Sequence, residues 1–152
     1  MNRLSVILLG VSLLTASACK NRNQVPEIAS VVFSRTVCYG TCPVYTMTIT
    51  GNGLATFEGE RFTDKIGSFT KQFSEVEAKT LFEDLATYSW AAFKDEYPAS
   101  VSDLPSTVFQ FTYKDTNKKV IVSGEHPSAL DVLEHRLSKI AESDGWTASN
   151  SK

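Results

Sequence analysis

Alternating polar and apolar residues mark a hairpin in the first half of this chain. Residues 44–50 place their large apolar side chains on one face and threonines on the other, which is the two-residue period of a half-buried strand. The Gly-Asn-Gly run at 51–53 is a strong turn signal, and a second strand is expected over 54–59. We therefore predict an antiparallel pair over these two segments.

Further segments have the composition or alternation of strands, and two have the spacing of amphipathic helices. The expected strands are 28–37, 66–73, 107–114 and 119–123. Ser74 and Glu77 form a capping box that opens the first helix, whose apolar stripe continues to about residue 88. Pro127 fits the first turn of the second helix, whose stripe consists of Leu130, Leu133, Leu137 and Ile140.

The order β-β-β-β-α-β-β-α predicts an α+β fold, with an antiparallel sheet and two helices packed on one face. A single domain is expected over residues 28–145, followed by a polar tail at 146–152. Residues 94–106 contain two prolines and are expected to form a loop long enough to carry function.

The first 19 residues have the layout of a bacterial lipoprotein signal. Arg3 precedes the apolar residues 4–14, and small residues lead to Cys19. The apolar run is too short for a membrane span, which needs roughly 20 residues. We expect cleavage after residue 18, acylation of Cys19, for example with palmitate, and a flexible tether over residues 19–27. The alternative is an ordinary signal peptide that leaves Cys19 as a free thiol.

Lipidation would place the domain in the cell envelope. Residue 20 is Lys rather than Asp, which favours delivery to the outer membrane, facing the periplasm or the cell surface. The expected partners are the membrane, through the anchor, and another envelope protein. The net charge of −2 comes without a basic stripe, so nucleic-acid binding is not expected.

The signatures of zinc proteases, serine hydrolases and nucleotide-binding loops do not occur in this sequence. We therefore expect no catalytic residue and no cofactor, and a binding or scaffolding role rather than an enzymatic one.

The run Cys-Tyr-Gly-Thr-Cys-Pro at 38–43 carries the distinctive chemistry of the chain. With Cys19 acylated, Cys38 and Cys42 remain to pair, and Gly40 can supply the sharp reversal that a bond between them needs. So small a ring adds only about 2 kcal/mol by the chain-entropy relation. A structural disulfide is the leading interpretation, and a redox-active thiol pair is an alternative.

A copper site is the third interpretation. Cys-x-x-x-Cys-Pro resembles the motif of the Sco-type copper chaperones, which implies two thiolates and a distant imidazole, supplied here by His126 or, in our preferred alternative, His135. In that family the motif opens a helix, whereas here a strand is predicted directly after Pro43. We therefore expect no metal, and keep copper delivery or thiol redox as the alternative function.

The motif and its surroundings also resemble an uncharacterised family of bacterial lipoprotein domains. The resemblance covers roughly residues 30–115 and implies location and fold but no catalytic residue. The matching residues are Arg35, the 38–43 motif, Tyr45, Ile49, Gly53, Gly59 and the run from Asp103 to Pro105.

A binding surface is expected where the cysteine turn meets the 94–106 loop. Its candidate residues are Tyr39, Gly40, Tyr97 and Asp103. Trp90, Phe93 and Tyr97, at the end of the first helix, are expected to pack at the rim of the core. If they were exposed together, they would indicate a partner or ligand surface.

Overall fold

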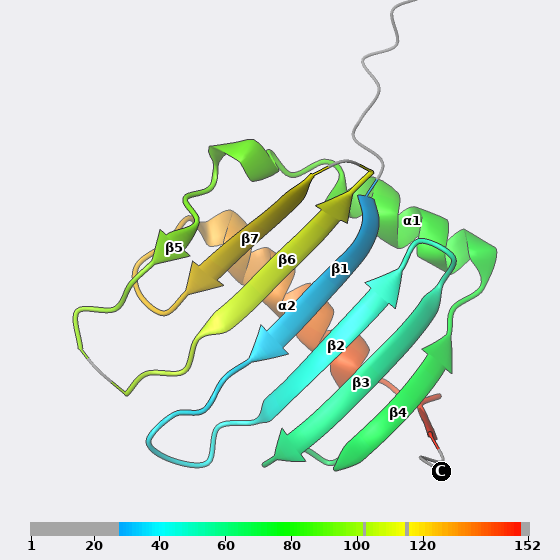
Figure 1. Cartoon of the computed structure of the whole chain (residues 1–152), viewed down its shortest axis with the longest axis horizontal. Helices are drawn as coiled ribbons and strands as arrows, with labels where there is room; N and C mark the ends of the chain where they lie inside the picture. Colours follow the sequence, from blue (N-terminus) through cyan, green and yellow to red (C-terminus); the bar gives the residue numbers. More distant parts are fainter. Residues whose placement is uncertain (1–27, 102, 115, 150–152) are drawn as a thin grey trace, which may run out of the picture.

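The computed structural model describes residues 28–101, 103–114 and 116–149, whose strands form one sheet (Figure 1). The expected signal, anchor cysteine and tether lie outside these residues. The strands are β1 (Ile28–Arg35), β2 (Val44–Thr50), β3 (Leu54–Arg61), β4 (Gly67–Gln72), β5 (Glu96–Tyr97), β6 (Thr107–Tyr113), β7 (Asn117–Val122) and β8 (Thr147–Ala148). The helices are α1 (Glu75–Leu85), the short 3₁₀ turn η1 (Trp90–Ala92) and α2 (Ser128–Glu142).

The α+β prediction is confirmed. The strand order in the sheet is β5-β7-β6-β1-β2-β3-β4-β8, and all neighbours are antiparallel except β5 and β7. Both helices lie on the same side of the sheet (Figure 1), and their apolar stripes join the inner face of the strands in one core. The capping box between Ser74 and Glu77 is present as predicted.

The first strand lies at the centre of the sheet, between β2 and β6. Phe33 is opposite Met47 on one side and Phe109 on the other, and all three side chains are fully buried. The rings of Phe33 and Phe109 lie 5.6 Å apart. The pairing of β1 with β6 joins segments more than 70 residues apart in the sequence. It therefore depends on the packing of the core rather than on a local turn.

Polar contacts attach α2 to the end of this central pair. Glu134 on α2 accepts a hydrogen bond from Arg35 at 2.6 Å and another from the Thr107 hydroxyl at 2.9 Å. Arg35 ends β1 and Thr107 begins β6. One carboxylate therefore connects the helix to both strands.

Two short segments differ from the sequence-based expectation. The 94–106 loop contains β5, which pairs with the outer edge of β7. The expected polar tail contains β8, which pairs with β4, and Trp146, whose ring lies 5.6 Å from that of Phe57. Two-residue strands have no detectable period, so sequence alone could not reveal them.

The sheet has two distinct ends (Figure 1). We call the end with the Gly51–Gly53 turn, the β6–β7 turn and the start of β1 the hairpin end. The opposite end, with residues 36–43, the turn 62–66 and the segment before β6, is the disulfide end. No helix in the described part of the chain is long and apolar enough to cross a membrane.

Candidate functional site at the disulfide end

The cysteine loop is a tight reversal between β1 and β2. The structure places the sulfur atoms of Cys38 and Cys42 at disulfide-bonding distance, with the Cα atoms 5.8 Å apart. Gly40 lies at the exposed tip, and its amide donates to the Cys38 carbonyl at 2.9 Å. β2 begins directly after Pro43, so the motif leads into a strand as predicted, and not into a helix.

Backbone hydrogen bonds connect this loop to the segment before β6. Thr36 donates its amide to the Ser106 carbonyl at 3.0 Å, and the Thr36 hydroxyl accepts from the Ser106 amide at 2.8 Å. The Tyr39 amide donates to the Asp103 carbonyl at 3.3 Å. The predicted meeting of the cysteine turn with this loop is therefore present.

Large apolar side chains collect on the loops of this end. Tyr39 is 92% exposed, and five other large apolar residues in the same loops are also exposed. Loop tips are normally polar, so this concentration of exposed apolar side chains makes the end a candidate interaction surface. We call the set the apolar rim; it consists of Val37, Tyr39, Phe62, Ile66, Val101 and Leu104.

The backbone is strained at the same end. Phe62 and Asp103 have φ angles of 54° and 75°, and they are the two non-glycine residues with positive φ in the described part of the chain. An aspartate tolerates this region better than a bulky phenylalanine does. Such conformations concentrate at functional sites, because the surrounding structure must hold them in place.

A cavity of about 170 Å³ separates Pro43 from the turn 62–66. Tyr45 lines it, and within the described residues the buried hydroxyls of Tyr45 and Ser138 have no hydrogen-bond partner in good geometry. Burial raises the pKa of Tyr45, although the nearby Ser138 hydroxyl acts to lower it. A small side-chain movement would pair the two hydroxyls.

The predicted surface residues divide into two groups. Tyr39, Gly40 and Asp103 are exposed beside one another at the disulfide end. Tyr97 does not belong with them, because β5 turns its side chain into the core, where it is only 8% exposed. Its hydroxyl accepts a hydrogen bond from the Lys94 amide at 3.1 Å.

The two histidines lie apart from any metal-binding cluster. His135 is exposed on α2. His126 follows β7, with one ring nitrogen 2.6 Å from the Gly124 carbonyl and the other 2.9 Å from Asp131. Within the residues that the structure describes, no three His, Cys, Asp or Glu side chains are grouped as metal ligands.

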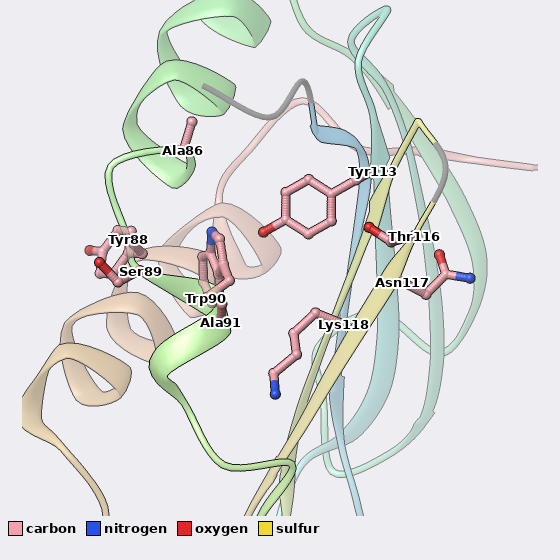
Figure 2. A pocket seen from close by; sticks show the side chains of 9 residues that line it. All are labelled: Ala86, Tyr88, Ser89, Trp90, Ala91, Tyr113, Thr116, Asn117 and Lys118. Carbon is pink, nitrogen blue, oxygen red and sulfur yellow. The ribbon is translucent and has the colours of Figure 1, made fainter. Parts of the chain in front are cut away.

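A second concave site, which the sequence did not predict, lies near the hairpin end (Figure 2). This cavity of about 570 Å³, which we call the Trp90 pocket, lies between η1 and the β6–β7 hairpin. Trp90 is almost fully buried against Phe111, with ring centroids 3.6 Å apart, so it belongs to the core itself and not to its rim. The Tyr113 hydroxyl points toward Trp90, and burial raises the pKa of Tyr113 to about 12.

The comparison with known families bears on the whole domain. A profile for a family described as a domain of unknown function, DUF6438, matches residues 29–141. The chain belongs to this family. DUF6438 covers both the disulfide end and the Trp90 pocket, but it has no assigned activity, so it supplies no functional residue. No curated protein and no solved structure matches the chain.

Proposed function

We propose that this protein is a lipid-anchored domain of the bacterial cell envelope that binds a partner protein through the apolar rim, without catalysis. The proposal rests above all on the concentration of exposed apolar side chains on the loops of one end of the sheet. The Cys38–Cys42 bond and the hydrogen bonds to Asp103 and Ser106 hold two of these loops together. A binding surface that is already ordered loses less entropy when it binds.

The direction of the chain supports the proposed anchor. β1 begins at the hairpin end and runs to the disulfide end, a length of about 26 Å for its eight residues. A tether that leads from Cys19 to Ile28 would enter the domain at the end opposite the apolar rim. The rim would then be able to face away from the membrane, toward the partner.

The anchor is tested by metabolic labelling with an alkyne analogue of palmitate. We expect label on the parent protein and none on Cys19→Ser, with Cys38→Ser/Cys42→Ser labelled like the parent. Label that persists in Cys19→Ser would contradict the proposed anchor, but it would have no bearing on the proposed partner surface.

The partner surface is tested by site-specific photo-crosslinking in living cells. A benzophenone amino acid is placed at Tyr39 in one variant and at Val132 in the control, because Val132 is also exposed but lies on α2, outside the rim. We expect a discrete crosslinked protein from position 39 only. Leu104→Ser in the same chain should reduce that adduct, since Leu104 belongs to the rim. Equal adducts at both positions, or none at position 39, would contradict the proposal.

A further inference from the structure

The outer edge of β7 is paired along only part of its length. β5 runs parallel to β7 beside Ile121 and Val122. In the described parts of the chain, no strand pairs on this side with Asn117–Val120. The free stretch of four residues is about 13 Å long.

The hydrogen bonds of β7 show which main-chain groups face this edge. The Ile121 amide donates outward to the Asp95 carbonyl, and the Ser123 amide donates outward to the Tyr97 carbonyl, both at 2.9 Å. Alternate residues of a paired strand face the same side, so Lys119 and Asn117 also point their N–H and C=O groups outward. No backbone bond from a described residue reaches those groups, which makes them a template for another extended chain.

A groove follows the same free stretch. The Trp90 pocket shares Asn117 and Lys118 with a second cavity of about 380 Å³, which continues past Asp95 and Ile121 beside β5. One end of the groove is therefore aromatic (Figure 2). The other end leads to β5, the strand of the same chain that already pairs with this edge.

The chemistry of the aromatic end favours an uncharged side chain. Trp90 lines the pocket, and its indole N–H donates a hydrogen bond to the Leu85 carbonyl at 2.7 Å. The Lys118 ammonium donates to the Phe93 carbonyl at 2.8 Å and is neutralised by Asp95 at 2.5 Å. Among the residues that the structure describes, the lining therefore presents no free charge, and Tyr113 brings an aromatic ring and one hydroxyl. Such a pocket accepts an apolar anchor with a polar edge.

We propose that this groove binds an extended peptide segment of a partner protein, which pairs with β7 at Asn117 and Lys119 and inserts an aromatic side chain into the Trp90 pocket. Main-chain bonds then provide affinity and the pocket provides specificity, as in other cases of strand addition. The incoming segment continues the line of β5 along the same edge. This site is separate from the apolar rim, so it does not depend on the function proposed above.

The first test uses synthetic peptides and the full chain in detergent micelles, observed by NMR. The probe is acetyl-Thr-Lys-Phe-Lys-Thr-amide, with a matched peptide that has Ala in place of Phe. We expect the Phe peptide to shift the amide signals of Asn117 and Lys119 and the indole signal of Trp90. Replacing Phe by Ala should weaken binding by about tenfold or more, because the buried ring is lost.

Two further peptides carry N-methyl groups on alternate amides, in opposite phases. A paired strand directs only one phase toward β7, so one methylated peptide should bind about tenfold more weakly and the other should bind like the parent. Equal binding of the two would overturn strand addition and leave a pocket for a side chain or a small molecule. The absence of any shift at Asn117 and Lys119 would overturn the proposal as a whole.

A protein variant gives an independent readout. Lys119→Pro removes one outward amide that β6 does not use, and proline is tolerated at such an edge position. We expect Lys119→Pro to weaken binding of the Phe peptide by about tenfold. Lys119→Val keeps the amide, so its affinity for the peptide should stay within about twofold of the parent value. If Lys119→Pro fails to fold, the methylated peptides on the parent protein decide the question. Binding to a folded Lys119→Pro at parent strength would contradict pairing at this residue.

Discussion

At the hairpin end of the sheet, Gly53 adopts a φ of 83°, whereas at the disulfide end Phe62 and Asp103 adopt 54° and 75°. Glycine reaches this region without steric cost, and other residues do so at a cost of about 1 kcal/mol or more. The turn at Gly53 is thus built from a residue that suits its backbone. The disulfide end keeps conformational strain and exposed apolar side chains together, which is the combination expected of a surface selected for binding at some cost in stability.

The largest effect is expected from Gly53→Ala at the hairpin end. An added Cβ would lie 2.8 Å from the Phe73 carbonyl oxygen at an unfavourable φ, so we expect a loss of about 2–4 kcal/mol, measured by urea unfolding. The matched control is Gly40→Ala at the disulfide end, where the nearest heavy atom is the Cys38 sulfur at 3.7 Å. Its effect should stay below about 0.5 kcal/mol. Equal losses in the two variants would remove the contrast.

The second effect concerns the disulfide. Reduction should lower the free energy of unfolding by about 2 kcal/mol, because the closed ring is small. Cys38→Ser/Cys42→Ser should show the same loss and no response to reductant. A redox titration sharpens the result: a potential below about −300 mV indicates a structural bond, whereas one near −200 mV would support the thiol-redox alternative.

The third effect separates strain from function at the disulfide end. Phe62→Asn places a residue that tolerates positive φ at a strained, exposed position, so stability should rise by about 0.5–1 kcal/mol. Crosslinking from position 39 should fall, because the apolar rim loses a member. Phe62→Leu keeps an apolar side chain and the unfavourable positive φ, so it should change neither the stability nor the crosslinking from position 39. A clear loss of stability in Phe62→Asn would mean that packing of the Phe62 ring contributes more free energy than its positive φ costs.

The smallest effect is the pH dependence of His126, which follows β7 at the disulfide end. Burial lowers the pKa of His126, but hydrogen bonds to the Gly124 carbonyl and to Asp131 outweigh it, so the pKa is raised overall. The protonated ring therefore stabilises the fold below pH 6.5, and this contribution disappears as the pH rises through the raised pKa. Thermal unfolding measured from pH 5 to 8 should show this loss of stability as the pH rises, and His126→Gln should abolish the pH dependence. A decline of the same size in the variant would assign it to another group.

Much of the fold could be predicted because its signals are local. The alternation in 44–50, the turn at Gly51–Gly53 and the capping box at Ser74 all lie within a few residues of the structure that they specify. The prediction for Tyr97 was wrong because a two-residue strand gives no period from which to infer which side chain points inward.

The candidate sites were predictable to different degrees. The cysteine turn and Asp103 could be placed on one surface because both lie in loops beside strand ends. The Trp90 pocket could not, since η1 and the β6–β7 hairpin that enclose it are brought together only by the core.

By itself, the sequence determined which segments become strands and helices, which face of each is apolar, and which two cysteines are close enough to form a small ring. The tertiary structure alone decided that β1 enters between β2 and β6, that part of the β7 edge has no strand partner among the described residues, and that apolar loop residues gather at one end. The physical reason is that periodicity defines the face of an element but not its neighbour. Any two amphipathic strands can pair, and the choice among them follows from the packing of the whole core.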